Sequence, residues 1–181
     1  MQQFSELVKL RQSCRNYDSA RKVEQEKIDL CLEAARISPS ACNTQPWFFT
    51  VVGGQKAREI GNLLMGGAKN SLTQDCPNYV VVSSVPANMP EASAIATNYR
   101  DFREIDIGLA VGQFCLQATE LGLGTCILGW FDEEAIKKIV GAPQAFSISL
   151  VLALGYPKAD DPLRRKPRKK KANMSALLGV E

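Results

Sequence analysis

The sequence of 181 residues contains no histidine. Histidine is the commonest general base near neutral pH and a frequent zinc ligand. Its absence excludes Ser-His-Asp and Cys-His nucleophile systems and the usual zinc hydrolase sites. We therefore expect no catalytic side chain and no metal site, and we expect any chemistry to be carried by a bound cofactor.

Other familiar signatures are also missing. The six cysteines, at positions 14, 31, 42, 76, 115 and 126, are never closer than eleven residues, so no Cys-x-x-Cys pair exists and reduced, mostly packed thiols are expected. Gly122 and Gly124 lack the third glycine of a dinucleotide fingerprint, and no GxxxxGK phosphate loop occurs. No apolar run approaches the roughly 18 residues of a membrane span, and Met1–Glu6 lacks the features of a secretion signal. These absences predict a soluble, cytoplasmic protein.

Composition and charge predict one compact domain over residues 1–181, with a basic C-terminal extension at about 158–181. The chain is 45% hydrophobic and 23% charged, and a domain of this length buries roughly two-thirds of its unfolded surface. The net charge is +3, but residues 158–171 alone carry +6, so the remainder is net acidic. A solvated tail is favoured on composition, with phosphate or nucleic-acid binding as alternatives. Because the rest of the chain is net acidic and the whole chain is only 7% aromatic, a nucleic-acid-binding module is disfavoured.

Apolar periodicity predicts helices alternating with strands. We expect helices at about 24–38 and 106–121, a further helix capped by Asp132, and strands at 48–52, 79–82, 125–128 and 147–155. This alternation is compatible with α/β or α+β architecture. The helix at 106–121 is apolar over so much of its circumference that we expect it to be buried. We interpret Glu133-Glu134 as a helix N-terminus and Asp160-Asp161 as a solvated turn.

Two polar clusters near the N-terminus carry the functional signal. Residues 11–15 place two guanidinium groups and the Ser13 hydroxyl close together, a donor set suited to a phosphate and to an electron-rich ring edge. Residues 39–47 form a loop whose Ser40, Asn43 and Gln45 offer polar groups beside the bulky Trp47. Taken singly, the clusters could be an exposed helix end and a surface turn. Together they indicate a binding site.

The order of motifs resembles the nitroreductase family of FMN-dependent NAD(P)H oxidoreductases. The motifs are Arg-x-Ser-x-Arg at 11–15, Pro-Ser-x-x-Asn-x-Gln-Pro-Trp at 39–47, Asp-Ile-Gly at 106–108, Leu-Gly-Leu-Gly at 121–124, Gly-Trp-Phe-Asp at 129–132, and Leu-Gly-Tyr-Pro at 154–157 followed by Lys-Pro-Arg at 166–168. The resemblance covers essentially the whole chain. It implies an α+β fold with a small, mostly antiparallel sheet flanked by helices, in an intertwined homodimer that binds FMN at the subunit interface.

The resemblance also assigns roles to residues. It implies that Arg11, Ser13, Lys166 and Arg168 hold the FMN phosphate and that Arg15 lies near the pyrimidine edge of the flavin. The loop at 39–45 would reach the cofactor of the partner subunit, and the backbone at 128–129 would face the reactive flavin edge. The cofactor-binding residues it implies are Arg11, Gln12, Ser13, Arg15, Pro39, Ser40, Ala41, Asn43, Gln45, Leu128, Gly129, Lys166 and Arg168.

The implied reaction is ping-pong. NADH or NADPH reduces the flavin, the nicotinamide leaves, and a nitroaromatic, quinone or similar small-molecule acceptor takes the electrons. A flavin-binding protein without turnover is an alternative. Many relatives carry an acidic residue near the flavin edge where this chain has Gly129. The stretches 66–78 and 86–103 are the least similar to the family, and we expect them to shape the substrate pocket.

Overall fold

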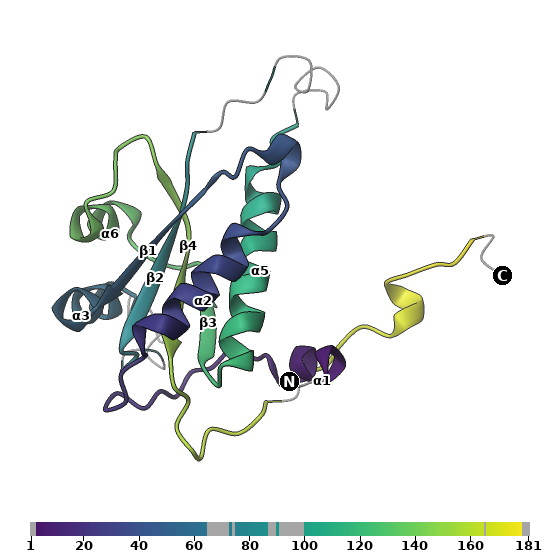
Figure 1. Cartoon of the computed structure of the whole chain (residues 1–181), viewed down its shortest axis with the longest axis horizontal. Coiled ribbons are helices and arrows are strands. Elements are labelled where there is room, and N and C mark those ends of the chain that lie inside the picture. The colour runs from purple at the N-terminus through teal and green to yellow at the C-terminus, as the bar shows by residue number, and fades with distance from the viewer. Residues whose placement is uncertain are drawn as a thin grey trace.

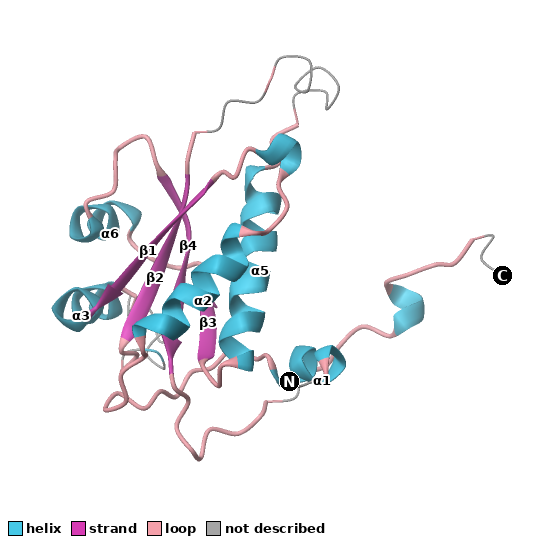
Figure 2. Ribbon diagram, viewed as in Figure 1, coloured by secondary structure: helices cyan, strands magenta, loops and turns pink. Residues whose placement is uncertain are grey.

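The computed structural model describes residues 3–64, 73, 75–86, 90, 100–164 and 166–178. Within these residues four strands form one sheet in the order β1-β2-β4-β3, and each neighbouring pair is antiparallel (Figure 2). The strands are β1 (Trp47–Gly53), β2 (Asn78–Ser84), β3 (Gly124–Leu128) and β4 (Ser147–Gly155). The small antiparallel sheet predicted from the sequence is confirmed, and each predicted strand is found to within two residues at its ends.

The described helices are α1 (Phe4–Leu10), α2 (Gln25–Arg36), α3 (Gly54–Leu63), α5 (Arg103–Glu120) and α6 (Glu133–Val140), with single 3-10 turns η1 (Ala41–Asn43) and η3 (Lys171–Asn173). Asp132 caps α6 as predicted, because its carboxylate accepts the backbone N–H of Ala135 at 3.0 Å. The sequence analysis did not anticipate α3. Gly54 has a φ of +60°, which turns the chain directly from β1 into that helix. Most of 66–78 and 86–103 lies outside the described residues.

Helices cover both faces of the sheet. Alternate residues of β2 point to opposite sides, so that Tyr79 and Val81 pack with α3 and α6, whereas Val80 and Val82 pack with α2 and α5 (Figure 1). The period of two in β2 and β4 therefore builds two apolar layers, one on each side of the sheet. No helix among the described residues is long and apolar enough to cross a membrane.

The segment that follows α1 is fixed against β3 and the end of β4. The backbone N–H of Cys14 donates to the carbonyl of Thr125 at 2.9 Å, and Tyr17 forms a bridge with Pro157. Gly124 permits this contact, because a Cβ atom there would lie 2.6 Å from the Cβ of Cys14. Residues 11–17 are thereby held beside both the start of β3 and the chain that leaves β4.

The long helix α5 is buried on one face only. Its residues Ile107, Val111 and Phe114 belong to the layer packed on the sheet. On the opposite side, Ile105 and Leu109 are 52% and 47% exposed in the single chain. The expectation of a buried helix is thus confirmed for the face toward the sheet. The six thiols are free and five are buried, with Cys42 exposed, as the spacing of the cysteines predicted.

Candidate functional site

Residues predicted to hold a phosphate line one cavity. The cavity measures about 620 Å³ and lies between the end of α1, the segment 11–13 and the chain after β4. Its lining residues are Glu6, Val8, Lys9, Leu10, Arg11, Gln12, Ser13, Leu163, Arg164, Lys166 and Arg168. The structure therefore brings Arg11, Ser13, Lys166 and Arg168 to one place, although about 150 residues separate the two pairs in sequence.

The cations of this cavity are not equivalent. Lys9 is paired with Glu6 at 2.7 Å, and Arg164 is paired with Asp161. Arg11, Lys166 and Arg168 form no ion pair with the residues that the structure describes. The cavity is thus lined by three cations without an ion pair among the described residues and by Ser13, a donor set suited to a phosphate.

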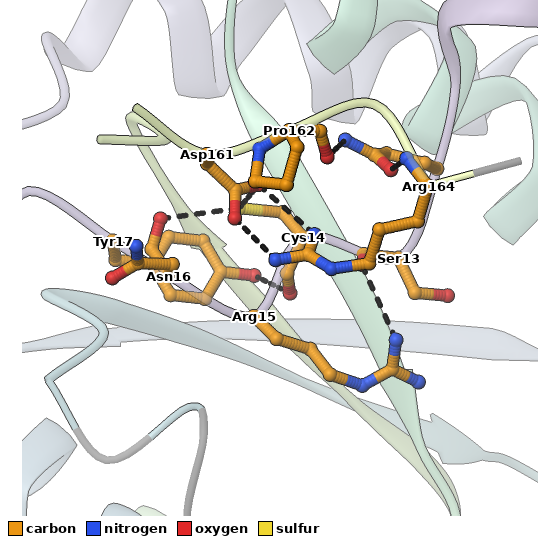
Figure 3. A network of polar contacts seen from close by, with 9 residues as sticks. Ser13, Cys14, Arg15, Asn16, Tyr17, Asp161, Pro162 and Arg164 are labelled. Atoms are coloured by element: carbon orange, nitrogen blue, oxygen red, sulfur yellow. Dashed lines mark hydrogen bonds and ion pairs between the residues drawn. The ribbon is translucent and has the colours of Figure 1, made fainter. Parts of the chain in front are cut away.

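Arg15 lies on the same segment and is half-buried. Its Nη1 donates to the carbonyl of Ser13 at 3.4 Å, and in Figure 3 the guanidinium turns toward Ser13 rather than toward Asp161. Burial raises the pKa of the neighbouring Cys126 thiol, while the Arg15 charge acts in the opposite direction. Arg15 is not among the residues that line the cavity, although it contacts Ser13, which does line it.

Two residues of this region were missed by the sequence analysis. Asp161 and Arg164 form a two-point ion pair in which the Asp161 side chain is 0% exposed (Figure 3). The interpretation of Asp160-Asp161 as a solvated turn is therefore wrong for Asp161. The available signal was the opposite charge three residues away, but such a spacing is common in exposed turns and says nothing about burial.

The Gln12 side chain is hydrogen-bonded to the backbone of residues 162–164. Its Nε2 donates to the carbonyl of Pro162 at 3.2 Å, and its Oε1 accepts the backbone N–H of Arg164 at 2.7 Å. Both ends of the amide are thus bonded to the backbone of the segment that leads to Lys166 and Arg168.

The second predicted cluster lies elsewhere in the chain. The backbone N–H of Ala41 donates to the buried carboxylate of Asp106 at 3.1 Å, at the first turns of α5. The Ser40 hydroxyl accepts the backbone N–H of Gln45 at 3.0 Å. Asn43 and Gln45 have φ angles of 54° and 45°, in the left-handed region that non-glycine residues rarely adopt, and both are exposed together with Pro39. The loop is held in a specific conformation and presents its polar groups outward.

The two predicted clusters lie at opposite ends of α5 within one chain (Figure 1). Ser13 pairs with Thr125, which follows the last turn of α5, whereas Ala41 contacts the first turns. The 18 residues of α5 span about 27 Å at 1.5 Å per residue. A single chain therefore does not bring the loop at 39–45 to the cavity at Arg11.

The two predicted residues at the end of β3, Leu128 and Gly129, differ in burial. Leu128 is 5% exposed and belongs to the core. Gly129 is exposed, and a Cβ atom built there would meet no atom within 4 Å. The packing of the described residues therefore does not require glycine at this position.

The fold is α+β, and its cation-lined cavity is formed by the end of α1, the segment 11–13 and residues 163–168. A profile of the nitroreductase family matches residues 8–156, and the chain belongs to this family. A Bacillus subtilis protein named provisionally as the NAD(P)H nitroreductase YdgI is 43% identical over 191 residues, covering 87% of this chain and 89% of the relative. The family predicted from the order of motifs is thereby confirmed.

Solved structures agree with the fold. A nitroreductase family protein from Clostridium difficile 630 is 28% identical, covers 99% of this chain and 100% of its own, and has a TM-score of 0.78. A nitroreductase from Bacteroides fragilis NCTC 9343, solved with bound FMN, is 20% identical, covers 98% and 100%, and has a TM-score of 0.73. The α+β nitroreductase fold is therefore confirmed for this chain.

Proposed function

We propose that this protein is an FMN-dependent oxidoreductase that uses NADH or NADPH to reduce a nitroaromatic, quinone or similar small molecule. The observation that carries the proposal is the cavity in which Arg11, Ser13, Lys166 and Arg168 converge, with three cations that lack an ion pair among the described residues. Family membership and the FMN bound by the Bacteroides fragilis protein support the choice of ligand.

The donor set fits a terminal phosphate. Arg11, Lys166 and Arg168 would supply charge-assisted hydrogen bonds, and Ser13 a neutral one. Arg15, which contacts Ser13 but does not line the cavity, would place a positive charge near the flavin ring and favour its anionic reduced form. When bound, FMN supplies reversible two-electron transfer between the nicotinamide and the acceptor in a ping-pong sequence. Held through its phosphate by these side chains, FMN would bind without a covalent bond, and no histidine is present as an attachment site.

We propose further that two chains complete each site. The loop at 39–45 lies at the far end of α5 from the cavity of its own chain, so it can serve a cofactor only in a partner. The exposed face of α5 supports this arrangement. Ile105 and Leu109 alternate there with Gly108 and Gly112, where a Cβ atom would meet no other atom within 4 Å, so a second helix can approach closely.

Coexpression of two variants, each damaged in a different half of the site, tests whether two chains share one site. One variant carries Arg11→Ala, and the other carries Asn43→Ala in the loop. Each homodimer has only damaged sites, whereas a mixed dimer contains one site with both halves intact. Coexpression with two affinity tags should therefore yield mixed dimers that bind FMN at half their sites with wild-type affinity. Mixed dimers without any site of wild-type affinity would show that each chain builds its own site.

A measurement of NADH or NADPH oxidation distinguishes an enzyme from a flavin-binding protein without turnover. The purified protein loaded with FMN should oxidise NADH or NADPH, and the rate should rise when a quinone or nitroaromatic acceptor is added. Bound flavin that is not reduced by either nicotinamide would contradict the proposed activity and favour a carrier without turnover.

A further inference from the structure

The Gln12 side chain and the Asp161–Arg164 ion pair join the N-terminal segment to the chain that leaves β4. The Gln12 amide donates to Pro162 at 3.2 Å and accepts from the Arg164 backbone at 2.7 Å, across 150 and 152 residues of sequence. Because one side-chain amide both donates to and accepts from the backbone, the two hydrogen bonds fix the position and the orientation of this segment.

The ion pair joins two residues of this same segment, Asp161 and Arg164. Arg164 Nη1 lies 3.1 Å from Asp161 Oδ2, and Nη2 bonds the other carboxylate oxygen. The thiol of Cys14 lies 3.9 Å from Asp161 Oδ2, so this carboxylate is packed against the N-terminal segment (Figure 3). The Asp161 side chain is 0% exposed and does not line the cavity, while Arg164 lines it with its charge already compensated.

Lys166 and Arg168 follow this anchored segment by two and four residues. Both side chains are exposed, and neither forms a hydrogen bond or ion pair with another part of the described chain; Arg168 bonds only the carbonyl of Pro167, at 3.2 Å. Their place in the cavity therefore depends on the anchor at 161–164. Without it, ordering these two cations around a ligand would cost conformational entropy at the moment of binding.

We propose that Gln12, Asp161 and Arg164 form a tail clamp, a set of positioning residues that holds Lys166 and Arg168 in place for the phosphate. The proposal rests on the proposed FMN site and assigns Gln12 to the backbone of the chain after β4 rather than to the phosphate. The clamp exists before the ligand arrives, so its effect is measurable without FMN.

Asp161→Asn distinguishes the clamp from simple electrostatics. The substitution removes a negative charge beside an anion site, and charge alone would tighten phosphate binding. The clamp predicts weaker phosphate binding, because the ion pair between Asp161 and Arg164 is lost. Asp160→Asn is a matched control: it makes the same charge change one residue earlier, on an exposed side chain with no hydrogen bond to the described residues.

The experiment measures affinity and backbone protection together. In Gln12→Ala and Asp161→Asn, FMN binding should weaken by about tenfold, while binding of riboflavin, which lacks the phosphate, should not change. In the FMN-free protein, hydrogen exchange at the Arg164 amide should accelerate in Gln12→Ala, which removes its acceptor. Asp160→Asn should leave all three quantities at wild-type values.

Several results would overturn the clamp. These are tighter FMN binding by Asp161→Asn, equal losses of FMN and riboflavin affinity, and unchanged exchange of the Arg164 amide in Gln12→Ala. Weaker FMN binding with unchanged exchange would instead make Gln12 a direct ligand. A wild-type protein that binds no flavin would contradict the proposed function, and the exchange measurement on the FMN-free protein would still decide whether the clamp exists.

Discussion

The backbone N–H of Ala41 donates to the carboxylate of Asp106 at 3.1 Å, and Asp106 is only 4% exposed. This bond joins the polar loop to the first turns of the helix that separates the two predicted halves of the site. An acidic side chain in the first turn of a helix is also favoured by the helix dipole. Asp106 therefore sets where the loop stands relative to the exposed face of α5.

Replacement of Asp106 by alanine should loosen the loop. The loss of a buried charged acceptor should lower the free energy of unfolding by about 1–3 kcal/mol and should also weaken FMN binding. Asp106→Asn keeps an oxygen acceptor and should cost less. Asp101→Ala, an exposed carboxylate paired with Arg103, serves as the control. Chemical denaturation and FMN titration measure the two effects. If Asp106→Ala is destabilised but binds FMN with wild-type affinity, the loop does not contribute to FMN binding.

The cations of the cavity that form no ion pair within the described part of the chain should contribute more to FMN affinity than the cations that are already paired. Arg11→Ala, and the double change Lys166→Ala with Arg168→Ala, should each weaken FMN binding by about 1.5–3 kcal/mol for every charge-assisted hydrogen bond removed. Lys9→Ala changes a lysine that lines the same cavity but is paired with Glu6, so its effect should be much smaller. Equal reductions of affinity in all three variants, measured by fluorescence titration, would mean that only the general positive potential matters.

Arg15 should act on the redox chemistry more than on affinity. Loss of its charge near the flavin ring should lower the midpoint potential by about 30–60 mV, the equivalent of about 1.5–3 kcal/mol for a two-electron couple. Arg15→Ala should also slow reduction by NAD(P)H, and Arg15→Lys should recover most of the potential. Spectroelectrochemistry of the bound flavin gives the value. An unmoved potential in Arg15→Ala would assign this residue to structure or phosphate binding.

The exposed face of α5 should control assembly. Leu109→Glu places a charge in the centre of that face and should produce monomers that bind FMN poorly, because each site would lack the partner's loop. Leu30→Glu is the matched control, since Leu30 is 50% exposed on α2 and Leu109 is 47% exposed. Light scattering and FMN titration compare them. A dimer that survives Leu109→Glu, or that is dissociated by Leu30→Glu alone, would place the interface elsewhere.

Much of the fold could be predicted because its apolar pattern is local. Near-continuous apolar runs mark β2 and β4, and the stripe through Ile107, Val111 and Phe114 marks the buried face of α5. The helix α3 could not be predicted in the same way, since Gly53 and Gly54 indicate the end of a strand equally well as the turn into a helix. Its start depends on the positive φ of Gly54, which the sequence does not reveal.

The site was predictable only where the residues resemble a known motif. Arg11, Ser13, Lys166 and Arg168 were predicted to act together, and the structure gathers them around one cavity. Asp161 was missed because its burial depends on packing against Cys14, a contact across 147 residues. Such long-range contacts leave no periodic signal in the sequence. They become visible only when the fold brings the two ends of the chain together.

Sedimentation of the FMN-reconstituted protein, followed at the flavin absorbance, tests the central claim most directly. Because two chains complete each proposed site, the flavin should sediment entirely with a dimer, at one FMN per chain, and denaturation should release it unmodified. A protein that retains no flavin after reconstitution with excess FMN, or an active monomer that carries flavin, would contradict the account.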